Sequence, residues 1–241
     1  MTVRSIAPAI LLVAAALVAS GCSAPKRLGQ VLAPHVADLM PHGDRDHFVY
    51  LSEKTVADHP PETSLAVEHV SSLEAPGEFQ ITESADGVRI GDSHWLSDDH
   101  GLSLLSEEVE GLGVRLAYDP PLLLFPQPLL VGEHRASSTG AATRLDDGTP
   151  VGLFRASVVV RSQSTRSRNP IAKGDAVLLE VTRSLEGPNG ALVIHVESLN
   201  AAGIGELESV AALEGVPLVV RRSLLCGFIQ GRAVGHCDEL K

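Results

Sequence analysis

The sequence contains few aromatic residues: one Trp, two Tyr and five Phe among 241 residues, or 3%. This scarcity predicts an aliphatic core and argues against a platform of stacked rings for sugars or bases. A surplus of basic residues is lacking too, since the formal net charge is −11. That charge argues against nucleic acid or anionic lipid headgroups as partners. Gly-x-Ser-x-Gly and His-Glu-x-x-His are also absent, so no sequence motif assigns catalytic residues or a cofactor.

Long hydrophobic runs are missing as well. The apolar run from Ile6 to Val18 has about 13 residues, whereas a membrane-spanning helix needs roughly 20. Arg4 precedes this run and small residues follow it at positions 19–21, which is the order found in secretory signal peptides. We therefore expect residues 1–21 to form a signal helix that is removed, and no second segment of this kind follows.

Cys22 comes directly after these small residues. The stretch Val18-Ala19-Ser20-Gly21-Cys22 resembles the lipobox of bacterial lipoproteins, in which the cysteine is lipidated and becomes the mature N-terminus. The resemblance implies an anchor on Cys22, and Ser23 in place of Asp is similar to lipoproteins sent to the outer membrane. Each buried acyl methylene contributes about 0.8 kcal/mol, so several chains make a durable anchor. Simple secretion or an uncleaved anchor is the alternative.

Cys226 and Cys237 remain once Cys22 is assigned to lipid. In an oxidising compartment such a pair usually forms a disulfide, which here would contribute roughly 2 to 3 kcal/mol. A redox or metal pair is the alternative, although the spacing differs from the two-residue gap of thiol oxidoreductases. Without residues 1–21 the chain has 220 residues and a formal net charge of −12, because Arg4 is the only charged residue lost. This length suits a single domain.

The pattern of the remaining chain predicts an all-β fold. Residues 22–46 are polar and contain Pro34 and Pro41, so we interpret them as a tether before a domain at residues 47–241. Within that domain, Val, Ile and Thr-rich runs alternate with Gly, Asp, Asn and Pro clusters, which predicts an antiparallel sheet of about 9 to 11 strands. The expected strands cover residues 47–56, 64–72, 78–83, 87–94, 102–108, 114–118, 151–161, 175–183, 191–198, 205–211 and 216–223.

The hairpin from Asp175 to Ser198 has the clearest local pattern. Asn189-Gly190 tolerates the backbone of a tight turn, and residues 177–182 alternate between two faces. One face of this sheet should therefore contact water.

Residues 120–131 are strongly apolar but include four prolines. Since proline removes a ladder donor and fixes φ, we expect neither a regular central strand nor a helix there. We predict an extended crossover laid over the sheet that closes one side of the core. The alternative is the apolar lip of a ligand groove, formed by Leu122, Leu123, Leu124 and Phe125.

Three sparse motifs are spread over most of the mature chain. They are Met40-Pro41-His42-Gly43 with Phe48 and Tyr50, Tyr118-Asp119-Pro120-Pro121 with the apolar residues after it, and Ala201-Ala202-Gly203-Ile204-Gly205. Together they resemble motifs of uncharacterised bacterial envelope proteins related to the TapB-like family. Phe48 and Arg135 stand where that family usually has tryptophan. The resemblance implies a curved antiparallel sheet, a half-barrel or open barrel similar to periplasmic lipoprotein carriers, and it implies no catalytic residues.

Two loops combine His with carboxylates and are the places where a metal could bind. They are residues 41–47 and residues 92–100, and neither has the spacing of a known zinc or calcium motif. We interpret both as solvated turns and expect no metal and no cofactor.

These patterns lead to one main functional hypothesis. We expect a non-enzymatic, outer-membrane lipoprotein that faces the periplasm or the exterior and acts as a binding or assembly component, with an envelope protein as its partner. A carrier or sensor of an apolar or lipid ligand is the alternative, and a hydrolase ranks last. A sheet face lined by aliphatic side chains and open to solvent would favour the carrier, whereas a filled core would favour the interaction module.

Overall fold

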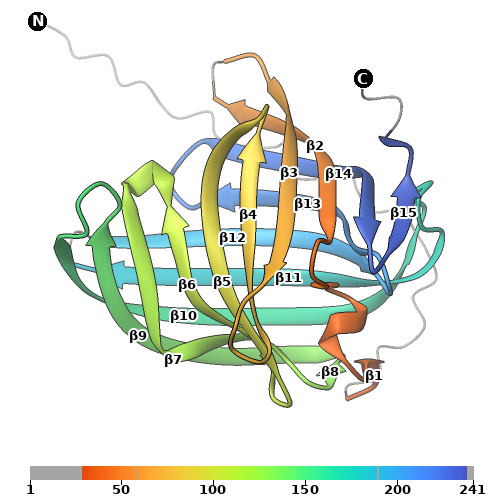
Figure 1. The fold of residues 1–241 in the computed structure, drawn as a ribbon, viewed down its shortest axis with the longest axis horizontal. Coiled ribbons are helices and arrows are strands. Elements are labelled where there is room, and N and C mark those ends of the chain that lie inside the picture. Colours follow the sequence, from red (N-terminus) through yellow and green to blue (C-terminus); the bar gives the residue numbers. More distant parts are fainter. Residues whose placement is uncertain (1–28, 58, 189, 238–241) are drawn as a thin grey trace, which may run out of the picture.

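The computed structural model describes residues 29–57, 59–188 and 190–237. The predicted signal peptide and Cys22 lie outside these residues. Almost all of the described chain is β-structure (Figure 1). The described helical segments are two short 3-10 turns, η1 (Val36–Asp38) and η2 (Glu110–Leu112). No helix in the described part has the length and hydropathy needed to cross a membrane.

Fifteen strands are present in the described residues. They are β1 (Val31–Ala33), β2 (His47–Val56), β3 (Glu62–Ser72), β4 (Glu78–Ala85), β5 (Val88–Asp98), β6 (Gly101–Val109), β7 (Val114–Pro126), β8 (Leu129–Leu130), β9 (Gly132–Arg144), β10 (Pro150–Ser167), β11 (Gly174–Gly187), β12 (Gly190–Ala201), β13 (Gly205–Leu213), β14 (Leu218–Ile229) and β15 (Arg232–Gly235).

Twelve of these strands form a closed barrel. Apart from β8, each strand from β2 to β14 pairs antiparallel with the next one along the chain. The last, β14, pairs with β2 from Leu218↔Val56 to Phe228↔His47, which closes the ring. In Figure 1, β3–β6 stand upright in front while β10–β12 cross almost horizontally behind them.

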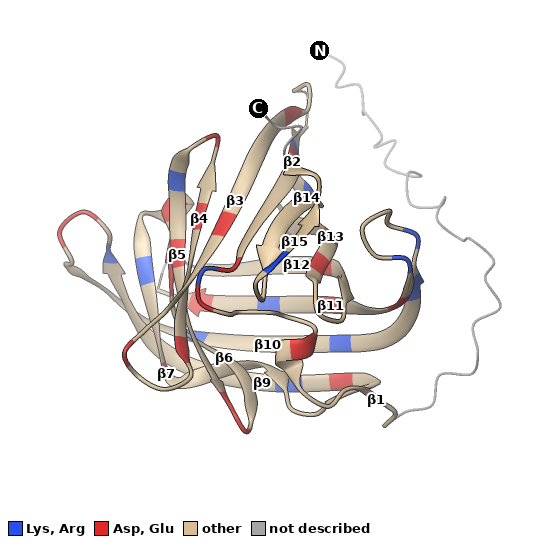
Figure 2. Ribbon diagram, turned by 45° about the vertical axis from the view of Figure 1, so that its right-hand side comes forward, with Lys and Arg blue, Asp and Glu red and all other residues tan. Residues whose placement is uncertain are grey.

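Closure corrects the prediction of a half-barrel or open barrel. The alternation within a strand shows which side chains are buried, but it contains no information about whether the first and last strands meet. The predicted hairpin is present, since β11 and β12 pair from Val177↔Asn200 to Gly187↔Gly190. The inward side of β11 includes Val177, Leu179 and Val181. Charged residues of both signs are spread over the strands of the barrel (Figure 2).

Strand β9 is missing from the sequence prediction because its inward residues are small. Ala136, Ser138 and Gly140 alternate along it, so it lacks the bulky apolar pattern of its neighbours. Phe154 of β10 fills the space instead: a Cβ atom on Gly140 would lie 2.7 Å from its ring. The volume that β9 leaves open is thus occupied from the adjacent strand.

The proline-rich segment lies within the barrel wall, which corrects its prediction as a crossover. Residues up to Pro126 belong to β7 and pair with β6 through Leu104↔Leu122 and Gly101↔Pro126, with one register shift between these two pairs. Pairing with β9 ends at Asp119↔Thr139. Beyond that point, side chains of β9 replace the ladder, because the Ser138 and Thr139 hydroxyls donate to the carbonyls of Pro120 and Asp119. Prolines are tolerated here because this edge needs few backbone donors.

Residues 29–46 pack onto the barrel, so the structure differs from the predicted tether over this part. Strand β1 pairs with β8, and Val36 and Leu39 of the segment are buried in the core. The backbone N–H of Gly203, between β12 and β13, donates to the carbonyl of Asp38. The segment therefore covers one end of the barrel, which we call the N-terminal end.

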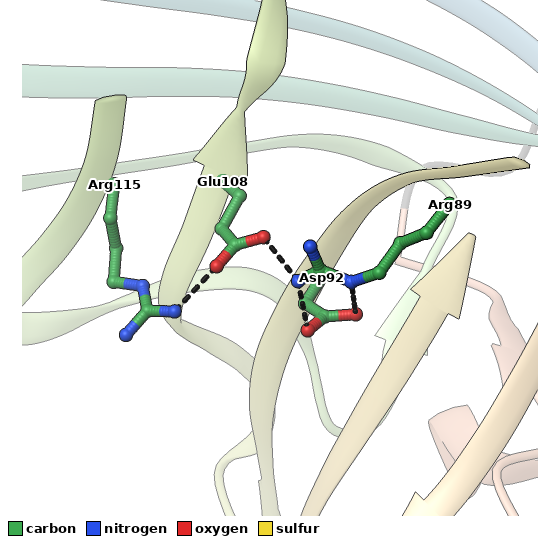
Figure 3. Close-up of polar contacts among 4 residues, drawn as sticks. All are labelled: Arg89, Asp92, Glu108 and Arg115. Carbon is green, nitrogen blue, oxygen red and sulfur yellow. Dashed lines mark hydrogen bonds and ion pairs between the residues drawn. The ribbon is translucent and has the colours of Figure 1, made fainter. Parts of the chain in front are cut away.

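Ion pairs join neighbouring strands on the outer face. On β5, β6 and β7, Arg89 contacts Asp92 and Glu108, while Arg115 contacts the other oxygen of Glu108 (Figure 3). Water screens the exposed guanidinium groups of these pairs, whereas the shared Glu108 side chain is only 6% exposed. Near the C-terminus, the structure joins Cys226 and Cys237 in a disulfide with a Cα–Cα distance of 5.3 Å. This is the pairing predicted from the sequence.

Candidate ligand-binding site

The interior of the barrel contains a cavity of about 770 Å³ at the end opposite residues 29–46. We call it the larger cavity. Its mouth lies between the turns at residues 110–113 and 145–149. Leu112 and Leu153 belong to the lining although 59% and 79% of their surfaces are exposed, so the cavity opens to solvent there. The walls are mainly apolar and include Val114, Leu116, Ala142, Phe154, Leu185 and Leu192.

A second cavity, of about 340 Å³, lies toward the N-terminal end. We call it the smaller cavity. Met40, Pro41 and His42 form one of its walls, so the segment predicted to be a tether contributes to a binding pocket. Aliphatic residues of β6, β7, β11 and β12 line much of the remainder.

Aromatic side chains gather around the smaller cavity. Five of the chain's eight Phe, Tyr and Trp residues belong to its lining. The rings of His42 and Phe79 stack with centroids 4.4 Å apart, and those of Phe79 and Trp95 lie nearly parallel at 6.4 Å. A low aromatic content therefore did not exclude a cluster of rings, because the fold concentrates them in one place. The five are Phe48, Tyr50, Phe79, Trp95 and Phe125.

An ion pair crosses the lumen between the two cavities. Arg183 on β11 donates from Nη1 to Oε2 of Glu107 on β6 at 2.9 Å, and the Tyr118 hydroxyl donates to the other carboxylate oxygen. Strands β7, β9 and β10 separate β6 from β11 along the sheet, so this contact spans the interior. Burial raises the pKa of Tyr118, which keeps its hydroxyl protonated as a donor.

Three carboxylates surround one guanidinium beside the smaller cavity. Arg222 Nη2 lies 2.9 Å from Glu68 Oε1 and 3.5 Å from Glu83 Oε1, and the guanidinium sits over the Tyr50 ring, 4.4 Å from its centroid. Glu206, on the adjacent strand β13, accepts a hydrogen bond from the Ser209 hydroxyl. Burial raises the pKa of Glu83 and Glu206, and Glu68 adds to both effects by repulsion.

The residues predicted as a groove lip are divided between two faces of the wall. Leu124 and Phe125 line the smaller cavity, whereas Leu122 is fully buried in the core. Leu123 is partly exposed, and its carbonyl contacts a ring nitrogen of His134. The structure thus places two of the four residues at a cavity.

The two loops considered for metals serve other contacts. Asp46 is buried, and its carboxylate accepts from the backbone N–H groups of Gly43 and Gln230 at 2.9 and 2.7 Å. Most of the second stretch belongs to β5 rather than to the predicted turn, and His94 there pairs with Glu78 of β4 at 2.8 Å. Among the described residues, no group of three or more His, Cys, Asp or Glu side chains is arranged to hold a metal ion.

Sequence reasoning missed the inward-facing charges. Arg222 follows Val220 and precedes Leu224 at inward positions of β14, and Glu68 lies between Ala66 and Val70 on β3. A charged residue at a strand position that should face the apolar interior indicates a buried partner, because an unpaired charge is costly to bury. The partner of each charge comes from another strand and was not evident.

Comparison with known proteins gives little similarity. No described protein family matches the chain, and no curated protein matches it. The resemblance to the TapB-like family therefore stays a prediction. A candidate exported protein with a YmcC-like fold from Bacteroides fragilis is 14% identical, with a TM-score of 0.45 over 81% of this chain and 98% of that chain. A candidate lipoprotein from Parabacteroides distasonis is 12% identical, with a TM-score of 0.46 over 77% and 95%.

Proposed function

We propose that this protein is an envelope lipoprotein, anchored to the outer membrane through Cys22, whose barrel binds an apolar or amphipathic ligand. The larger cavity carries this proposal. Its volume of about 770 Å³ falls within the range of small-molecule pockets, its walls are mainly apolar although Arg144 and Asp146 contribute to them, and its mouth is open to solvent. A core filled by side chains would instead have favoured a pure interaction module.

Binding explains the inward charges better than catalysis does. Glu107 is engaged by Arg183 and Tyr118, and Glu68 by Arg222. Protein donors thus contact both carboxylates, whereas a general acid or base needs an oxygen within hydrogen-bond reach of the substrate. We therefore propose a carrier or sensor rather than a hydrolase, with no cofactor.

The binding proposal is tested by filling the larger cavity. Ala142 lines it, and the neighbouring Ala141 points to the outer face of the same strand. We expect Ala142→Trp to abolish the fluorescence gain of N-phenylnaphthylamine, a neutral apolar probe, while Ala141→Trp leaves it unchanged. Native mass spectrometry of the detergent-free protein should also detect a co-purifying lipid in the wild type and less of it in Ala142→Trp.

The outcomes of this test separate cleanly. Equal loss in both variants would point to a general effect of tryptophan on the fold, which a thermal melt would reveal. If the wild type neither binds the probe nor co-purifies with a lipid, the carrier function is overturned.

The anchor is tested separately with Cys22→Ser. This variant should lose incorporated acyl label and move from the outer-membrane fraction to the soluble fraction. Retention of the label would refute the lipobox interpretation, without affecting the ligand proposal.

A further inference from the structure

The smaller cavity combines aromatic rings and carboxylates in one lining. It gathers five of eight aromatic residues, and two carboxylates, Glu68 and Glu206, belong to its lining. Aromatic faces attract cations through their quadrupole, and carboxylates attract them through their charge.

The charges around this cavity do not balance. Arg183 also lines the cavity, but Glu107 pairs with it; within the described part of the chain, Arg222 is the cation that faces Glu68, Glu83 and Glu206. When all three carboxylates are ionised, this group has a formal charge of −2. Burial raises the pKa of Glu206, and repulsion from Glu68 and Glu83 adds to this effect.

Arg222 already shows how the wall accommodates a cation. Its guanidinium lies over Tyr50 and beside Glu68, so one aromatic face and one carboxylate are used. Glu206 and the ring of Trp95 line the same cavity, and the aliphatic residues Val181, Ile194 and others continue the wall. An apolar chain with a positive head group would match both parts.

We propose that the smaller cavity binds a cationic amphiphile, an alkyl chain with an ammonium head group whose charge is neutralised by Glu206 and Glu68. This inference rests on the proposed ligand-binding role of the barrel and adds a ligand class to it. An anionic head group would face uncompensated carboxylates. A neutral sugar head group would use the rings but leave the excess negative charge.

Trp95 provides a direct measurement, because it is the chain's one tryptophan and it lines this cavity. The full-length protein is titrated with dodecyltrimethylammonium, dodecanoate and dodecyl maltoside, which share one chain length and differ in head group. All three are kept below their micelle-forming concentrations. We expect dodecyltrimethylammonium to shift the Trp95 emission with a Kd at least tenfold lower than those of the other two.

Two variants test the role of the carboxylates. Glu206→Gln keeps the acceptor for Ser209 but removes the charge, and we expect the preference for the ammonium head group to fall about tenfold. Glu197→Gln is the matched control, since Glu197 is an exposed carboxylate of β12 next to the lining residues Val196 and Ser198. Should Glu206→Gln fail to fold, Glu68→Gln takes its place.

The result also distinguishes this inference from the function on which it rests. Equal Kd values for the three probes would overturn the ligand class, and so would a head-group preference that Glu206→Gln leaves unchanged. In either case, N-phenylnaphthylamine binding to the larger cavity would still support the carrier function. Tighter binding of the maltoside would assign the cavity to sugar head groups instead. Loss of all binding, that of N-phenylnaphthylamine included, would overturn both.

Discussion

Replacing Arg222 with Met should destabilise the barrel strongly, because this side chain holds the carboxylate group beside the smaller cavity. Its surface is 16% exposed and that of Glu68 is 20% exposed, so their ion pair is largely shielded from water. The substitution removes this pair, the weaker contact with Glu83 and the contact with the Tyr50 ring. It leaves three carboxylates near one another with no guanidinium among them.

The size of the effect follows from these contacts. Breaking a buried ion pair by removing one partner costs about 3 to 5 kcal/mol. Because Arg222 and Glu68 are partly exposed, we expect the free energy of unfolding to fall by about 3 kcal/mol, the lower end of this range. For a domain of this size that loss corresponds to a decrease in Tm of roughly 6 to 12 °C. Urea denaturation at neutral pH, followed by Trp95 fluorescence, measures the free energy of unfolding directly.

Two further variants decide whether the ion pair is the cause. Arg221→Met is the control, because Arg221 is exposed on the outer face of the same strand and should cost at most about 0.5 kcal/mol. Adding Glu68→Gln to Arg222→Met removes one of the stranded charges and should recover at least about 1 kcal/mol. Equal losses in Arg221→Met and Arg222→Met, or strictly additive effects in the double variant, would refute this account.

Three other predictions concern stability. The pKa of Glu206 is raised from 4.5 in the folded protein, so at a pH just above 4.5 the folded state holds a proton that the unfolded state has lost. The free energy of unfolding should therefore decrease as the pH rises through the folded-state pKa. Glu206→Gln should reduce this decrease in thermal melts over a pH series. Gly140→Ala should cost about 2 to 3 kcal/mol because its Cβ would collide with the backbone carbonyl oxygen of Ala117 and with the Phe154 ring, whereas Gly187→Ala, with open space around it, should not destabilise in the same denaturation assay. Reducing the Cys226–Cys237 disulfide should lower stability by about 2 to 3 kcal/mol but leave the far-UV spectrum of the barrel intact, since β14 still pairs with β2.

Most strands were predictable from the sequence, because apolar and polar residues alternate along a strand that has one buried face. Strand β2, at His47–Val56, has the predicted bounds, and most other predicted strands are longer in the structure by a few residues. Strand β9 was not predictable by this rule, because its inward positions hold small residues that complement Phe154. Residues 120–126 were not predicted as a strand because they contain prolines. The structure tolerates these prolines because β7 no longer pairs with β9 beyond Asp119.

The candidate site was less predictable than the strands. The sequence offered Leu122, Leu123, Leu124 and Phe125 only as an alternative groove lip, and two of the four, Leu124 and Phe125, line the smaller cavity. Glu206 and Trp95 were not, because each has an ordinary local context and acquires its meaning from residues of other strands. Met40 and His42 were assigned to a tether, yet they form a wall of the cavity.

The sequence by itself determined the all-β class, the antiparallel hairpins and the pairing of Cys226 with Cys237, because each depends on local alternation, turn chemistry or residue count. Only the tertiary structure decided that β14 meets β2, that the lumen holds two cavities, and that Arg183 reaches Glu107 across it. The physical reason is distance along the chain. Closure and lumen contacts join residues that are far apart in sequence, and no local pattern records which distant partner a strand or a buried charge will meet.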